Sequence, residues 1–126
     1  MFSHINFQSL GVTDMERAVT FYRDVMGLTV EVDAPYGEGR WVFMGLPGGN
    51  TRLHFDQKDV VAPQKTPSLI LVTDNVDATC ETLQSRGVRI DKGPEDAPWE
   101  PGTRWAIIHD SEGNMVLIQT IGGNNG

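Results

Sequence analysis

Val-Thr-Asp-Met-Glu-Arg-Ala-Val-Thr-Phe-Tyr-Arg-Asp-Val-Met-Gly-Leu, residues 12–28, is the stretch of sequence that decides the fold. Thr13 and Asp14 are typical helix N-caps, and Thr13 with Glu16 has the spacing of a capping box. Gly27 stands where a helix takes a left-handed C-terminal cap. Between the caps, apolar side chains recur with the period of a helix that is buried on one side: Met15, Val19, Tyr22 and Met26. The segment therefore predicts a strand end, a helix and a stop.

The chain contains a second copy of this pattern, which indicates an internal repeat. Residues 12–14 recur at 72–74, an offset of 60, and Asp74 is expected to cap a second helix that stops at Gly87. Further along, Arg40 and Trp41 recur as Arg104 and Trp105, an offset of 64. One four-residue insertion in the second copy, within residues 97–102, accounts for the change of offset.

Each copy adds three further apolar runs after its helix, which predict strands. The expected strands are 5–12, 28–32, 40–46 and 51–55, followed by 69–72, 88–91, 104–109 and 115–120. The sequence thus predicts two βαβββ repeats, near 3–57 and 67–121, joined by a linker at 58–66 and followed by a frayed tail at 122–126. The expected fold class is α+β, a single domain whose curled, cup-like mixed sheet carries its helices on the outside.

Composition limits the partners of this chain. Its 126 residues include 17 acidic and 10 basic side chains, a formal net charge of −7. Nucleic acid and anionic membrane surfaces are disfavoured partners, because both need a basic patch. No apolar run approaches the roughly 18 residues of a membrane span. Cys80, the one cysteine, cannot form an intramolecular disulfide, so we expect a cytoplasmic protein.

The two signatures at residues 12–28 and 110–119 (Asp-Ser-Glu-Gly-Asn-Met-Val-Leu-Ile-Gln) resemble the vicinal oxygen chelate superfamily. That superfamily includes glyoxalase I, bleomycin-resistance proteins, fosfomycin-resistance enzymes and extradiol dioxygenases. The resemblance implies a cup that holds a divalent metal through one His, Gln or Glu from each of four strands. It also implies a homodimer, because the cup often closes only between units.

The positions that the resemblance assigns to the metal ligands carry other residues here. They fall at Phe7, Leu53, Ser68 and Leu117. We therefore expect no metal cofactor, and an apolar cup that binds a small organic molecule. Gln119 and Arg104 are candidates for orienting that ligand, although Arg104 could instead cover a packed Trp105 with its aliphatic stem. Trp99, inside the insertion, is a candidate lid or a structural plug.

The alternative is a metal-dependent lyase or dioxygenase of the same superfamily. A one-residue error in the strand register would turn Gln8 and His54 into the cup, because neighbouring strand residues face opposite sides. Both could then bind a divalent metal ion. Without such an error, His54 is expected to face the surface or the helix. A third interpretation, an accessory domain without chemistry, is less favoured because no further domain accompanies it.

Overall fold

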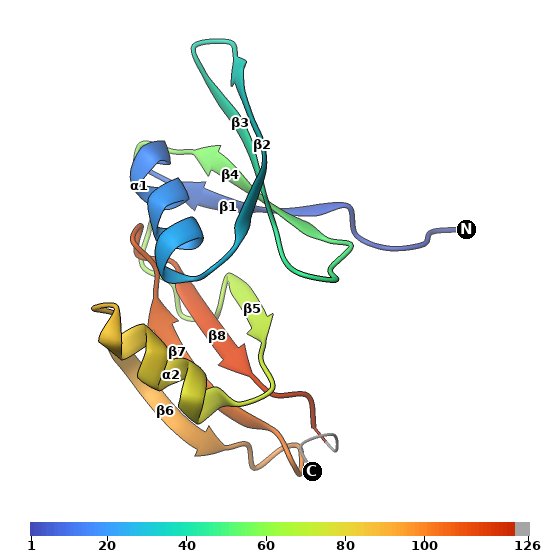
Figure 1. Cartoon of the computed structure of the whole chain (residues 1–126), viewed down its shortest axis with the longest axis vertical. Coiled ribbons are helices and arrows are strands. Elements are labelled where there is room, and N and C mark those ends of the chain that lie inside the picture. Colours follow the sequence, from blue (N-terminus) through green and yellow to red (C-terminus); the bar gives the residue numbers. More distant parts are fainter. Residues whose placement is uncertain (123–126) are drawn as a thin grey trace. The chain divides into compact units, whose positions relative to one another are not determined.

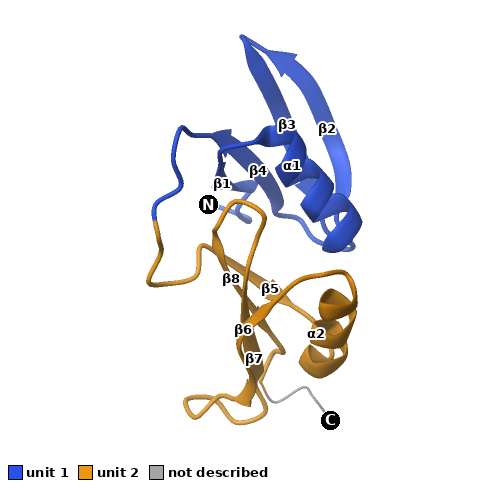
Figure 2. Cartoon of the chain, turned by 90° about the vertical axis from the view of Figure 1, so that its left-hand side faces the viewer, with its two compact units in different colours: residues 1–62 blue, residues 63–126 orange. Residues whose placement is uncertain are grey.

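The computed structural model describes residues 1–122 and consists of two compact units. The first unit spans residues 1–62 and the second begins at Pro63, so the boundary lies within the predicted linker 58–66 (Figure 2). Each unit has a four-stranded mixed sheet with a helical segment against one of its faces (Figure 1). The predicted α+β class and the two βαβββ repeats are confirmed. Of the predicted tail, only Gly122 lies within the described residues.

The first unit follows the predicted order of elements. They are β1 (Phe7–Val12), α1 (Met15–Thr20) with a π-helical continuation η1 (Phe21–Val25), β2 (Thr29–Tyr36), β3 (Gly39–Gly45) and β4 (Arg52–Gln57). The sheet order is β1-β4-β3-β2, with β1 parallel to β4 and the other pairs antiparallel.

The second unit repeats this topology with its own elements. They are β5 (Leu69–Val72), α2 (Val76–Ser85), β6 (Ile90–Asp96), β7 (Arg104–His109) and β8 (Met115–Gln119). The order is β5-β8-β7-β6, again with one parallel pair, β5 and β8. Among the helices of residues 1–122, none combines the length and the hydropathy needed to cross a membrane.

The helix caps differ in part from the sequence prediction. Asp14 caps α1 as expected, since its carboxylate accepts a hydrogen bond of 3.0 Å from the backbone N–H of Arg17. The capping box predicted from Thr13 is wrong, because Asp14 takes the cap position. In the second unit Asn75, not Asp74, accepts the corresponding bond at 3.0 Å. The predicted repeat was thus one residue out of register at the start of the second helix.

The π-helical turn explains this one-residue difference. The first helical segment begins at Met15 and stops before Gly27, whereas the second begins at Val76 and stops before Gly87. The first segment is therefore one residue longer, and a π turn is the usual way for a helix to accommodate one extra residue. Both glycines have positive φ, at 82° and 89°, as a left-handed helix stop requires.

A hydrophobic core lies between helix and sheet in each unit. In the first unit, Tyr22 and Phe55 are fully buried, with ring centroids 5.4 Å apart. In the second, Cys80 and Leu83 of α2 are buried over the same sheet face as Ile118. Burial raises the pKa of the Cys80 thiol, so this cysteine stays protonated and packs as a small apolar side chain.

The turn between β7 and β8 is built on a buried polar network. One carboxylate oxygen of Asp110 accepts from the backbone N–H groups of Glu112 and Asn114, both at 2.8 Å, and the other accepts from the Asn114 side chain at 3.0 Å. The amide of Gln64 donates to Asn114 at 2.7 Å and accepts from the backbone N–H of Met115 at 2.8 Å. Gln64, expected in the linker, is therefore a structural part of the second unit.

Candidate functional site

Each sheet has one face under its helix and one face, here called the open face, on the other side. Residues that pair across neighbouring strands point to the same face, so the register identifies the members. In the first unit His54 pairs with both Phe43 and Ser9, and Phe7 pairs with Arg52. Ring contacts join the side chains of Phe7, Phe43 and His54 to one another and to that of Trp41, so these rings lie on one face.

Four rings on the open face of the first unit form an aromatic cluster, made of Phe7, Trp41, Phe43 and His54. The His54 ring lies 4.2 Å from that of Trp41 and 5.4 Å from that of Phe7, and the rings of Phe7 and Phe43 are 5.0 Å apart. Phe43 and His54 are buried, whereas Phe7 and Trp41 are half-buried and reach the surface. The cluster offers a rigid apolar surface with one polar ring in it.

His54 is held as a neutral imidazole within this cluster. Its Nδ1 lies 3.0 Å from the hydroxyl oxygen of Ser9. Burial lowers the pKa of His54 below its ordinary value of 6.5, and the nearby Asp56 carboxylate opposes this effect only in part. At neutral pH the ring therefore carries no charge and exchanges a hydrogen bond with Ser9.

Acid is expected to destabilise the protein through His54. The unfolded chain protonates this ring as the pH falls through 6.5, while the folded protein resists protonation, so stability is lost below that pH. The melting temperature measured between pH 8 and pH 5 should fall more steeply for the wild type than for His54→Gln. Asp33 and Asp77 have lowered pKa values and titrate below 3.8, outside this window. Equal slopes for the two proteins would contradict the assignment.

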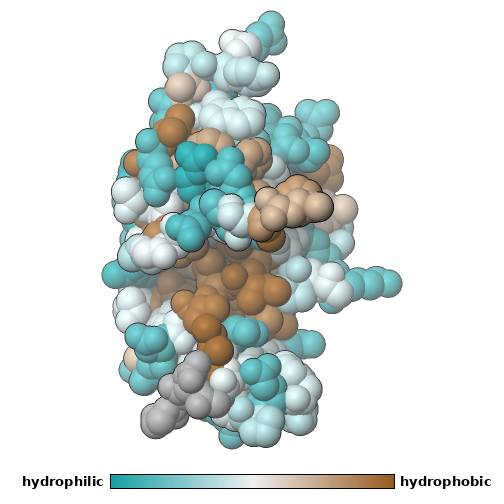
Figure 3. Space-filling model, turned by 90° about the vertical axis from the view of Figure 1, so that its right-hand side faces the viewer, coloured by the Kyte–Doolittle hydropathy of each residue, from teal (hydrophilic) through white to brown (hydrophobic). Residues whose placement is uncertain are grey.

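The open face of the second unit is mostly aliphatic. Leu117 pairs with Ile70 and Ile107, and Gln119 pairs with Val72. Ile70 and Val72 are 56% and 57% exposed, which is unusual for side chains of their kind. Figure 3 shows apolar side chains gathered at the surface of this unit, between polar ones. The predicted positions of Leu117 and Gln119 thus lie together on one apolar face.

Two tryptophans lie at the end of this second face. Trp105 pairs with Gln119, and its ring lies 6.2 Å from that of Trp99 in the preceding loop. Trp99 is 64% exposed, so it is no structural plug. The indole N–H of Trp105 is buried and has no hydrogen-bond partner among the residues that the structure describes.

The strand register corrects the second expected ligand position, which is occupied by His54 and not by Leu53. Leu53 is only 3% exposed and pairs with Met44 on the helix-covered face, so it does not line the open face. His54 takes that place: it pairs with Phe43 just as Leu117 pairs with Ile107. The expectation that His54 faces the surface or the helix is therefore wrong. The connection from Phe43 to His54 is one residue longer than that from Ile107 to Leu117, which the repeat alignment did not include.

Gln8 does not join His54 on the open face. It pairs with Leu53, so its side chain leaves the sheet on the opposite side from that of His54. The two residues proposed as alternative metal ligands are therefore separated by the sheet.

The residues at the four expected ligand positions do not fit a metal site. With the corrected register these are Phe7, His54, Ser68 and Leu117, of which only His54 has a side chain that commonly binds a divalent metal. The Ser68 hydroxyl donates a hydrogen bond of 2.6 Å to Gln64. Within residues 1–122, no group of three or more His, Cys, Asp or Glu side chains is placed to hold an ion.

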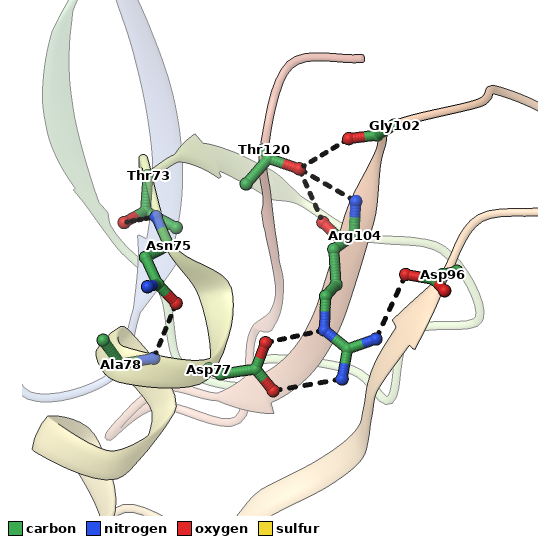
Figure 4. Close-up of polar contacts among 8 residues, drawn as sticks. All are labelled: Thr73, Asn75, Asp77, Ala78, Asp96, Gly102, Arg104 and Thr120. Carbon is green, nitrogen blue, oxygen red and sulfur yellow. Dashed lines mark hydrogen bonds and ion pairs between the residues drawn. The ribbon is translucent and has the colours of Figure 1, made fainter. Parts of the chain in front are cut away.

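Arg104 lies on the helix-covered side of its sheet, not among the open-face residues. Its guanidinium donates to both carboxylate oxygens of Asp77 at the start of α2, at 2.7 and 3.0 Å, and to Asp96 at 3.1 Å (Figure 4). Arg104 thereby holds the pKa of Asp77 below its usual range. The predicted ligand-orienting role of Arg104 is replaced by a structural one, because its guanidinium joins Asp77 of α2 to Asp96 of β6.

The first unit has the same arrangement around Arg40. Its guanidinium donates to both oxygens of Asp33, at 3.0 and 2.7 Å, and to Glu16 of α1 at 2.7 Å. The repeated Arg-Trp pair in the sequence thus marks two equivalent links between a helix start and a strand. The signal that could have revealed them is the acidic residue in the first turn of each helix, Glu16 and Asp77.

Comparisons with known proteins match nearly the whole chain. The model of the family described as "Glyoxalase/Bleomycin resistance protein/Dioxygenase superfamily" matches residues 2–118. The uncharacterized protein YetH of Bacillus subtilis (strain 168) is 25% identical over 122 residues, covering 94% of this chain and 99% of its own.

Two of the similar solved structures come from Streptomyces sp. CB03234. TnmS3, described as an antibiotic binding protein, is 35% identical with a TM-score of 0.82, covering 94% of this chain and 96% of its own. A glyoxalase/bleomycin resistance protein is 34% identical with a TM-score of 0.76, covering 93% and 100%.

Proposed function

Because the chain belongs to the glyoxalase/bleomycin resistance protein/dioxygenase superfamily, we propose that it is a member that binds a small organic molecule and needs no metal to do so. The ligand lies against the open face of the first unit, on the aromatic cluster. The proposal is for binding alone, and no bond is made or broken in it.

The aromatic cluster is the observation that carries the proposal. At two of the positions where the superfamily places metal ligands, this chain has Phe7 and His54, whose rings lie 5.4 Å apart. The Trp41 ring packs against that of His54 at 4.2 Å. Burying apolar ligand surface on these rings contributes about 25 cal/mol per Å². Because the rings already pack against one another, little side-chain entropy is lost on binding. The neutral His54 and the Ser9 hydroxyl add polar groups that can orient the ligand.

The similarity to TnmS3 supports the same class of ligand. That protein is described as antibiotic-binding, and at 35% identity the likeness covers 94% of this chain. An antibiotic is therefore a suitable first candidate for the ligand, and one with planar aromatic rings would match the rings of the aromatic cluster. We also propose that the protein is a homodimer and is cytoplasmic. The exposed Ile70 and Val72 support the dimer, since association would remove them from water. Sedimentation velocity measures that assembly directly.

Trp41→Leu is expected to weaken ligand binding about tenfold, because it removes the ring that packs against His54 while keeping an apolar side chain. Intrinsic fluorescence titrations with a panel of aromatic antibiotics, in the presence of a chelator, measure the affinity. Phe21→Leu is the matched control, since Phe21 contacts Tyr22 on the helix side of the same unit and its loss should leave the affinity unchanged.

Elemental analysis of the dialysed protein tests metal independence. We expect well under one equivalent of Ni, Zn, Mn or Fe per chain, and the same ligand affinity with and without the chelator. One equivalent of metal per chain, or binding that the chelator abolishes, would overturn the proposal in favour of a metal-dependent lyase or dioxygenase.

A further inference from the structure

We propose that Arg52 makes the aromatic cluster selective for aromatic anions, with the ligand's carboxylate or phenolate bound by the Arg52 guanidinium while its rings lie on the cluster. This inference rests on the proposed function and specifies the chemistry of its ligand.

Arg52 lies at the cluster itself. It pairs with Phe7 across β1 and β4, and it stands two residues before His54, so its side chain leaves the sheet on the open face. The guanidinium carbon is 3.8 Å from the centroid of the Phe43 ring. A positive charge therefore lies directly beside the rings that would hold an aromatic ligand.

The charge of Arg52 has no carboxylate partner among the contacts of residues 1–122. Within that part of the chain, the guanidinium donates one hydrogen bond, to the neutral side-chain oxygen of Asn6 at 3.2 Å. Arg40 and Arg104, by contrast, are each bound by two carboxylates. In a chain of net charge −7, an arginine left without a carboxylate on the candidate binding face is available to an external anion.

The guanidinium is also held in place. Stacking on Phe43 and the bond to Asn6 restrict the side chain before any ligand arrives, which reduces the entropy lost on binding. A guanidinium has five N–H donors, so most of them stay available for the two parallel bonds that a carboxylate accepts.

Neighbouring groups do not cancel this charge. His54 is neutral because burial lowers its pKa, so it neither repels nor replaces Arg52. Asp56, the next residue of β4 on the same face, forms an ion pair of 2.9 Å with Lys58. The guanidinium of Arg52, in contact with the Phe43 ring, therefore keeps its positive charge at the cluster.

Paired probes with the same ring test the inference. The carboxylate 2-naphthoate and the neutral 2-naphthamide are titrated against the full chain by fluorescence or calorimetry at low salt. We expect the wild type to bind the carboxylate about tenfold or more tightly than the amide. Arg52→Gln should bind both probes alike, with the affinity of the wild type for the amide. Arg104→Gln, the matched control, should keep the preference of the wild type.

The outcomes separate this inference from the proposed function. If the wild type binds both probes equally, or Arg52→Gln keeps the preference, the role of Arg52 is overturned while binding of aromatic rings stands. If neither probe and no aromatic antibiotic binds, the proposed function fails and the inference with it. Should Arg52→Gln not fold, as judged by its melting transition, Arg52→Lys replaces it: it keeps the charge but not the paired donors, so the preference should fall.

Discussion

Ile118→Glu is expected to unfold the protein, whereas Leu117→Glu, one residue earlier on β8, is expected to leave it folded. Ile118 is 2% exposed on the helix-covered face. A glutamate there would lose the buried side chain and bury an unpaired carboxylate, at a cost of about 5 kcal/mol or more. That is comparable to the whole stability of a small protein.

Leu117 is half-buried on the open face, where a carboxylate can reach water. Leu117→Glu should therefore cost about 1–3 kcal/mol. Urea denaturation followed by circular dichroism measures both variants. A cost at Leu117 as large as that at Ile118 would contradict the assignment of the two faces.

Asp110→Ala is expected to destabilise the protein by about 3–4 kcal/mol, because it removes the acceptor of three buried hydrogen bonds in the turn between β7 and β8. Two backbone N–H groups would lose their partner there. The change should appear in the denaturation midpoint and as faster amide exchange at Glu112 and Asn114.

Asp74→Ala provides the control for that experiment. Asp74 is exposed and lies just before the cap residue Asn75, so its loss should change stability by less than about 0.5 kcal/mol. Comparable losses at Asp110 and Asp74 would show that the turn network contributes no more than an ordinary surface carboxylate.

Much of the fold could be predicted because its signals are local. The strands expected at 69–72 and 104–109 have those bounds in the structure. Strand β2 is longer than the apolar run that predicted it, ending at Tyr36, which pairs with Gly39. Hairpin pairing extends a strand beyond its apolar residues, and no local period shows where that pairing stops.

The candidate site was harder to predict, because a strand side chain changes face with each residue. A single extra residue in the connection to β4 moved Leu53 under the helix and His54 onto the open face. No motif in the sequence reveals this extra residue, because a glycine-rich turn can have either length. Phe7 and Leu117 lie on the open face as expected. Their positions were counted from the nearby Asp14 and from the turn at residues 113–114, and no extra residue lies in between.

The two repeats, their helix caps and stops, and the absence of ligand side chains at Phe7 and Leu117 follow from the order of residues, because period, capping and side-chain chemistry act over a few positions. The face of His54 and the different environments of Arg52 and Arg104 follow from contacts between distant segments. Arg104 meets Asp77 from 27 positions away, while Arg52 meets Phe43 and Asn6. Which charges and rings meet thus depends on the strand register and on how each helix packs against its sheet, and both arise only when the chain folds.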